Sequence, residues 1–261
     1  MQATSSKNRR PRCLILTYHS ISAGNSPLCV SPGLFVEQIK WLAANAQVIS
    51  LADAVAVLES RRPLPDRSVV LTFDDAFEDF FSQAAPVLRE ARMPATVFVP
   101  TAYCGLTNRW PGQPNWVIEQ PIMTWDQVRE LAHEGLFCFG GHSVTHPKLT
   151  EIPLADVEQE LAGSKRHLEE RTGAAIDFFC YPYGNCNSSV RQVAARLYRA
   201  ACSTQTGMLS ASQDPLLLPR VDAHLVRERA VFQRMFSPGF RLYLSLRRKV
   251  RRVRGFEPSV N

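Results

Sequence analysis

Short apolar runs alternate with amphipathic stretches along most of this 261-residue chain. Most of the runs are continuously apolar, which is typical of parallel strands that are covered on both faces. The stretches between them have the apolar spacing of helices that bury one face. Strands and helices in alternation favour an α/β fold with a parallel sheet, and a closed barrel and an open, doubly wound sheet both fit the pattern.

The alternation predicts where the individual elements lie. The expected strands are Cys13–His19, Ser68–Asp75, Ala95–Pro100, Leu136–His142, Asp177–Tyr183, Ala200–Ser203 and Leu216–Val221. The expected helices are Gly33–Ala44, Leu51–Glu59, Glu78–Ala91, Thr124–His133, Leu154–Thr172, Ser188–Tyr198 and Phe240–Val253. Two helix ends carry clear signals, because Thr124 and Gln127 form a capping-box pattern and Gly173 can terminate a helix.

Composition divides the chain into three parts. Residues 1–12 are polar and basic and are expected to be disordered, residues 13–239 to fold as the main domain, and residues 240–261 to form a basic tail. Seven Lys and Arg residues lie between Arg241 and Arg254 without an acidic residue, so the formal net charge of +6 becomes −1 when they are set aside. The tail could be a helix that lies on an anionic membrane surface, or a solvated basic segment. No nucleic-acid recognition motif accompanies the charge, so we expect no nucleic-acid partner.

The apolar runs also bear on location. None approaches the roughly 18 residues that a membrane-spanning helix needs. The run Cys13–Leu16 is too short for the apolar core of a secretory signal. The seven cysteines match no zinc-finger spacing and are expected to be reduced. We therefore expect a cytoplasmic protein, which the basic tail could hold at the inner face of the membrane.

Four of the expected strands end in residues that can do chemistry. In parallel α/β folds, ligands bind at the carboxyl ends of the strands. Side chains that follow different strands can therefore meet at one rim. The residues at these strand ends are Asp74 and Asp75, His142 with His146 four residues later, Tyr183, and His19.

Two histidines and two aspartates in this set suggest a metal-dependent hydrolase. His142 and His146 would lie on one face of a helical turn, close enough to bind one metal ion. Adjacent side chains at a strand end diverge, so Asp75 could bind the ion while Asp74 accepts a proton from water. Other interpretations remain open at this point: two unrelated histidines, and a solvated turn whose aspartates cap a helix.

Three ordered motifs resemble those of the polysaccharide deacetylase family, carbohydrate esterase family four. They are Thr-Phe-Asp-Asp at 72–75, Gly-Gly-His-Ser-Val-Thr-His-Pro at 140–147 and Phe-Cys-Tyr-Pro-Tyr-Gly at 179–184. Met123–Asp126 is also similar to the family, and Leu14–His19 is similar to its exopolysaccharide-modifying branch. The resemblance spans residues 12–221. It implies a distorted (β/α) barrel with about seven parallel strands, formed by residues 13–239.

The resemblance also implies a reaction. Members remove N-acetyl groups from a glycan or glycan precursor, releasing acetate and leaving a free amine on the sugar. Asp75, His142 and His146 would bind a divalent metal, usually zinc, and Asp74 would be the general base. The backbone N–H of Tyr183 would help to stabilise the oxyanion. An N-acetylated glycan is therefore the expected partner.

Two features of many family members are missing here. Many have an arginine near the position of Cys180 that orients the base, and Arg220 could take that role in this chain. Many also have a late Leu-x-His motif whose histidine protonates the leaving amine. His224 is the nearest candidate, His19 is the other histidine at the rim, and either could instead be structural. Arg220, His19 and Tyr183 are expected to line the substrate site.

An irregular loop is expected between Tyr103 and Pro121. The aromatic residues in or beside it are Tyr103, Trp110, Trp116 and Trp125. They could stack on sugar rings or pack the loop onto the domain.

Two other functions fit the same residues. One is a metal amidohydrolase that acts on a small non-sugar amide, and the other is a catalytically inactive, glycan-binding member of the fold. The intact aspartates and histidines argue against the inactive member.

Overall fold

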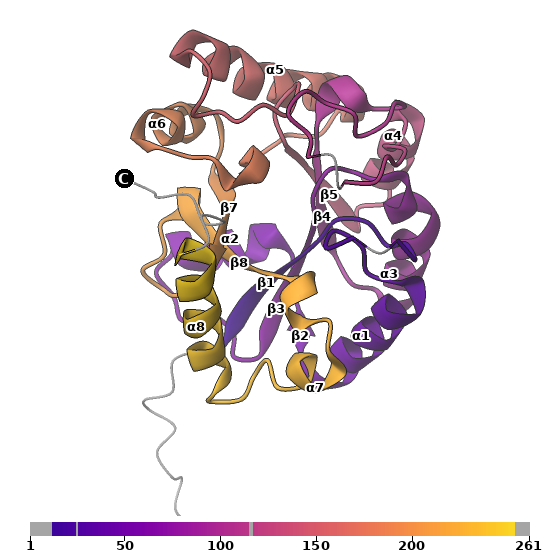
Figure 1. The fold of residues 1–261 in the computed structure, drawn as a ribbon, viewed down its shortest axis with the longest axis vertical. Coiled ribbons are helices and arrows are strands. Elements are labelled where there is room, and N and C mark those ends of the chain that lie inside the picture. Colours follow the sequence, from indigo (N-terminus) through magenta and orange to yellow (C-terminus); the bar gives the residue numbers. More distant parts are fainter. Residues whose placement is uncertain (1–11, 25, 115–116, 254–261) are drawn as a thin grey trace, which may run out of the picture.

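Seven parallel strands form a closed barrel in the computed structural model, which describes residues 12–24, 26–114 and 117–253 (Figure 1). The strands are β1 (Cys13–Tyr18), β3 (Ser68–Phe73), β4 (Ala95–Val99), β5 (Phe137–Gly141), β6 (Phe178–Cys180), β7 (Ala200–Thr206) and β8 (Leu218–Asp222). Their order around the barrel is β1-β8-β7-β6-β5-β4-β3, and pairing of β1 with β3 closes the ring. The distorted (β/α) barrel with about seven strands is thus confirmed. The disorder expected for the first residues falls outside the described part of the chain, Arg12 excepted.

The distortion is visible beside β3. The two-residue strand β2 (Gln47–Val48) pairs with Ser68 and Val69 at the start of β3. The next strand, β4, pairs only with Thr72 and Phe73 at its end. Since β1 pairs along the whole of β3, β2 and β4 share the opposite edge. Two residues are too few to give a strand pattern, and the sequence did not predict β2.

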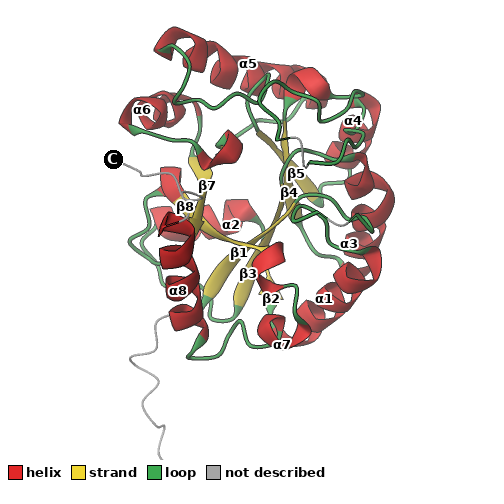
Figure 2. Ribbon diagram, in the orientation of Figure 1, coloured by secondary structure: helices red, strands yellow, loops and turns green. Residues whose placement is uncertain are grey.

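Helices surround the barrel (Figure 2). They are α1 (Pro32–Asn45), α2 (Leu51–Glu59), α3 (Ala85–Ala91), α4 (Trp125–His133), α5 (Leu154–Thr172), α6 (Ser188–Leu197), α7 (Arg229–Phe232) and α8 (Phe240–Val253). The capping box of Thr124 and Gln127 forms as expected, and Gly173 ends α5 in a left-handed conformation. The helix expected over Glu78–Ala91 is instead a π-helical turn, Phe80–Ala84, followed by α3.

The strand side chains fill two apolar layers. Every residue of β1 and β3 is buried, and alternate side chains face opposite ways. One set, including Leu14 and Leu16, packs with the surrounding helices, and the other, including Ile15, packs inside the barrel with residues of α2. Figure 1 shows α2 behind the barrel opening. The interior is therefore apolar on the α2 side, and the polar groups gather at the carboxyl ends of the strands.

The C-terminal helix α8 packs against the barrel. Phe240 and Leu244 are buried, and the Tyr243 hydroxyl donates to the Leu225 carbonyl over 2.7 Å. The basic segment thus begins as a docked helix, while residues 254–261 lie outside the described part. Within the described ranges, every helix is too short or too polar to cross a bilayer.

Candidate active site

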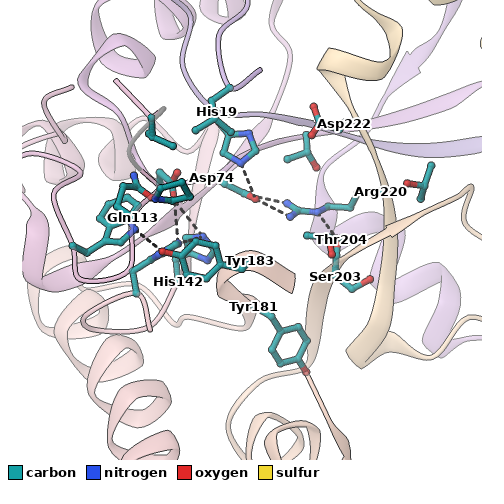
Figure 3. Close-up of a pocket in the computed structure, with 18 residues that line it drawn as sticks. His19, Asp74, Gln113, His142, Tyr181, Tyr183, Ser203, Thr204, Arg220 and Asp222 are labelled. Carbon is teal, nitrogen blue, oxygen red and sulfur yellow. Dashed lines mark hydrogen bonds and ion pairs between the residues drawn. The ribbon is translucent and has the colours of Figure 1, made fainter. Parts of the chain in front are cut away.

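The carboxyl ends of the strands surround a cavity of about 210 Å³. Figure 3 shows its side chains converging from β1, β3, β7 and β8 and from the loops after β5 and β6. The predicted site residues that line it are Asp74, Asp75, His142, His146, Tyr183, Arg220 and His19. Leu28, Pro114 and Val117 add an apolar wall.

Three buried side chains place metal-binding atoms within contact of one another. Asp75 Oδ1 lies 3.4 Å from Nε2 of His142 and 3.3 Å from Nε2 of His146, and the two Nε2 atoms are 3.2 Å apart. Ligands about 2.0–2.1 Å from a tetrahedral ion are separated by about 3.3–3.4 Å. The spacing therefore fits one small divalent ion bound by all three residues.

The prediction of a helical turn from His142 to His146 is wrong. His142 directly follows β5, and the chain then enters a loop in which Ser143 (φ 63°) and His146 (φ 58°) are left-handed. The His146 N–H donates to Ser143 Oγ over 3.0 Å. Two left-handed residues bend the loop back on itself, so histidines four positions apart meet without any helix.

Glu160 on α5 holds this loop, a role that was not predicted from the sequence. One carboxylate oxygen accepts the N–H groups of Val144 and Thr145, each over 2.8 Å. The other accepts the Thr145 hydroxyl over 2.6 Å. A glutamate in a helix rich in charged residues gives no sequence signal for this role, which depends on how α5 packs beside the loop.

Each histidine ring is oriented by its surroundings. His142 Nδ1 lies 2.7 Å from the Cys180 carbonyl, so this nitrogen carries the proton and leaves the Nε2 lone pair free to bind an ion. The His146 ring packs against the rings of both Trp110 and Tyr183, with centroid distances of 4.2 and 4.7 Å. Both imidazoles are thus held ready to bind.

The aromatic residues in or beside the loop at 103–121 serve mainly in packing. Trp110 is buried, and its indole N–H donates to the Tyr183 hydroxyl over 3.0 Å. Tyr103 packs edge-on against Trp110. Trp125 lies beneath the guanidinium of Arg171. Trp116 falls outside the described residues. Trp110 therefore attaches the loop to the metal-binding region.

Arg220 forms a bidentate ion pair with Asp74, as Figure 3 shows. The guanidinium donates to both carboxylate oxygens over 2.7 Å, and its Nε donates to the Ser203 carbonyl over 3.0 Å. Arg220 Nη2 also lies 3.1 Å from Cys180 Sγ. The motif resemblance places the base-orienting arginine of many family members near the position of Cys180, so Arg220 reaches the same region from another strand. A bidentate, buried pair fixes the plane of the Asp74 carboxylate.

Electrostatics keep both aspartates ionised. Burial acts to raise the pKa of Asp74, but the charge and hydrogen bonds of Arg220 outweigh it and lower this pKa overall. Burial likewise opposes ionisation of Asp75, and the adjacent imidazoles of His142 and His146 lower its pKa. Both carboxylates therefore carry their charge at neutral pH, one available as a ligand and one as a proton acceptor.

A second group of possible metal ligands overlaps the first. Atoms of Asp74, His142 and Cys180 lie within 4.8 Å of one another. Burial raises the pKa of the Cys180 thiol to about 11, so the thiol stays protonated. The Asp74 carboxylate is already paired with Arg220. The Asp75 group is therefore the better metal site.

The two remaining candidate histidines differ in position. His19 lines the cavity, and its Nε2 lies 3.8 Å from Asp74 Oδ2. His224 lies in the short 3-10 segment Ala223–Val226 after β8 and is not among the residues that line the cavity. The backbone N–H of His224 donates to the Asp222 carboxylate. Because His224 does not line the cavity, His19 is the better placed of the two, and the catalytic role of His224 stays a prediction.

Comparisons with known proteins agree with this geometry. The family model described as polysaccharide deacetylase matches residues 61–201. YxkH of Bacillus subtilis, which is named for the same family, is 29% identical over 218 residues, covering 82% of this chain and 73% of YxkH. A Staphylococcus aureus poly-beta-1,6-N-acetyl-D-glucosamine N-deacetylase is 27% identical over 169 residues, covering 60% of this chain and 54% of that protein. The Streptococcus pyogenes deacetylase PplD, solved in complex with acetate, superposes with a TM-score of 0.71 at 27% identity, covering 82% of this chain and 93% of PplD.

Proposed function

This chain belongs to the polysaccharide deacetylase family, and from that premise we propose that it is a metal-dependent hydrolase that removes N-acetyl groups from a glycan. One observation carries the proposal: an ionised, arginine-bound Asp74 lies in the same cavity as three clustered metal-binding residues. A metal ion that acidifies water, together with a separate base that accepts its proton, is one established arrangement for hydrolysing an unactivated amide.

The substrate we propose is a polymer of N-acetylated hexosamine used in exopolysaccharide synthesis. The Staphylococcus aureus relative is named for deacetylation of poly-beta-1,6-N-acetyl-D-glucosamine. The Streptococcus pyogenes deacetylase holds acetate, which is the small product of such a reaction. The cavity of this chain combines an apolar wall with the polar cluster, which suits an acetyl methyl group beside an amide.

We propose zinc as the ion, held by Asp75, His142 and His146. Two imidazoles and one carboxylate are the donor set of many catalytic zinc sites, and the observed spacing of the donor atoms fits an ion of that size. When bound, the ion supplies a Lewis acid that polarises the amide carbonyl and acidifies water.

The protein groups account for the proton transfers. Asp74 accepts a proton from the attacking water; a carboxylate has about four lone-pair sites, so the pairing with Arg220 leaves it able to do so. His19 donates a proton to the leaving nitrogen, because it lines the cavity beside Asp74 and does not belong to the metal-binding group. The N–H of Tyr183 would donate to the oxyanion, as the resemblance implies. The products are acetate and a free amine on the sugar.

Acetate release from a panel of N-acetylated oligosaccharides and small amides, with and without a chelator, tests this function. We expect release from the oligosaccharides alone and its loss on chelation. Asp74→Asn should lower turnover by about 10²–10⁴-fold while retaining the metal, and His19→Ala should also lower it. His224→Ala is the matched control and should keep its activity. Wild-type protein that releases no acetate from any glycan, or an Asp74→Asn variant as active as wild type, would contradict the proposal.

A further inference from the structure

Helix α8 has two apolar faces, of which only one meets the barrel. Phe240 and Leu244 are buried against the domain. Leu242, Leu246 and Val250 are 65%, 54% and 46% exposed. Spacing of four residues aligns these three on one side of a helix, on the side away from Phe240 and Leu244. They form a ridge, called here the outer ridge, about 12 Å long by helix rise.

The outer ridge is flanked by positive charge. Arg247 and Lys249 are exposed beside it, and Arg241 and Arg248 lie on the same helix. The helix contains no acidic residue, and its sequence includes Arg251 and Arg252 before the helix ends at Val253. An apolar ridge between basic side chains is the arrangement by which interfacial helices insert into an anionic lipid surface.

The alternative occupants fit the outer ridge less well. A second copy of this chain would bring two strongly basic helices together, and their charges would repel. Duplex nucleic acid would use the charge but gain nothing from three exposed aliphatic side chains. An anionic bilayer satisfies both features, because its headgroups attract the cations while its acyl region takes up the aliphatic groups.

The position of α8 relates the outer ridge to the cavity. Arg248 Nη2 lies 3.5 Å from Oε1 of Gln205 on β7. The neighbouring residues Thr204 and Thr206 line the cavity. Figure 1 shows α8 running along the outside of the barrel beside β7 and β8. The C-terminal half of α8 therefore reaches the catalytic end of the barrel.

We propose that α8 docks the protein on an anionic lipid bilayer through its outer ridge and the flanking basic residues. Docking holds the catalytic end of the barrel near the headgroups, where a membrane-attached glycan could reach it. The proposal rests on α8 alone and would stand even if the substrate were a different amide.

Cosedimentation of the full chain with vesicles tests the docking. We expect binding to vesicles that mix phosphatidylserine with phosphatidylcholine and little binding to phosphatidylcholine alone. The triple variant Leu242→Ser, Leu246→Ser, Val250→Ser should partition at least tenfold less. Its matched control is Leu106→Ser, Ile118→Ser, Leu154→Ser, which removes the other large exposed apolar side chains of the described residues and should bind like wild type.

A variant that removes basic residues separates the contribution of charge from that of the apolar ridge. Each basic residue near an anionic surface strengthens binding by roughly fivefold, so Arg247→Gln with Lys249→Gln should weaken it by about 25-fold. Arg61→Gln with Arg62→Gln, also exposed but outside α8, is the control. Circular dichroism and activity on a soluble oligosaccharide should be unchanged in all variants.

Three results would overturn the docking. Wild-type chain that does not sediment with anionic vesicles is the first. The second is a ridge variant that binds as well as wild type. The third is a wild-type dimer in sedimentation velocity that the ridge variant abolishes, because that would assign the ridge to a second copy.

Discussion

The pair of Asp74 and Arg220 shows how a buried charge becomes a usable base. The two residues are 146 positions apart in sequence, and each is almost completely buried. A lone buried carboxylate would take up a proton, because burial disfavours its charge. The bidentate arginine reverses that preference and also fixes the direction of the carboxylate.

Replacing Arg220 should therefore move the pH dependence of the reaction. In Arg220→Met, burial of Asp74 is no longer opposed, so its pKa rises and the base becomes protonated at a higher pH. The acidic limb of the kcat/KM profile should shift to higher pH, and activity at neutral pH should fall by about tenfold or more. The profile is measured on protein whose folding has been checked by thermal melting, since an unpaired buried charge can cost about 3–5 kcal/mol.

Two variants serve as controls for this shift. Arg220→Lys keeps a positive charge beside Asp74 and should retain more of the acidic activity than Arg220→Met. Arg196→Met removes an exposed arginine from α6 and should leave the profile unchanged. An Arg220→Met profile with its acidic limb in the wild-type position would show that the arginine does not set the pKa of the base.

Individual residues could be predicted where a strand end and a motif agreed. Asp74, Asp75, His142 and His146 follow directly from such positions, and Arg220 was suggested because it ends a late strand. The rest depends on packing that sequence spacing does not encode. Cys180, expected only to be a reduced cysteine, presents its carbonyl to His142 and its thiol to Arg220.

At the scale of elements, the site is built from strand ends and strained turns. Five of the eight described non-glycine residues with positive φ lie at or beside it: Asp75, Ala76, Ser143, His146 and Tyr183. Such conformations are costly and persist only where surrounding contacts enforce them. Strands were predicted well because continuous apolar runs mark them, and helices because their apolar period is strong. The turns were not, because a left-handed residue other than glycine has no reliable sequence signal.

The contact between α5 and the loop after β5 leads to a testable prediction. Glu160 accepts two backbone N–H groups and one hydroxyl from this loop, so Glu160→Gln removes the charge and exchanges one acceptor for a donor. We expect metal affinity to fall by about 10–100-fold, the usual effect of losing a residue that orients a ligand. Competitive titration with a chromophoric chelator measures it.

Glu170 provides the comparison, because it lies on the same helix but pairs with Arg166 at the surface. Glu170→Gln should bind the metal as wild type does. If wild type, Glu160→Gln and Glu170→Gln bound the metal with equal affinity, the loop would keep its shape without Glu160.

For the whole molecule, closure of the barrel is what assembles the site. Pairing of β1 with both β3 and β8 brings His19, Asp74 and Arg220 to one rim, although they lie far apart in the chain. The apolar runs predicted parallel strands, but they fit an open sheet equally well. Only the motif resemblance favoured a barrel, because closure depends on which strands pair and not on the character of any one strand.

The metal content of purified protein tests the central claim, that Asp75, His142 and His146 hold one catalytic ion. Elemental analysis of wild type, His142→Ala and the exposed-histidine control His133→Ala should be paired with acetate release from the same samples. We predict about one divalent ion per chain in wild type and in His133→Ala, and loss of both metal and activity in His142→Ala. Equal metal content in wild type and His142→Ala would contradict the account.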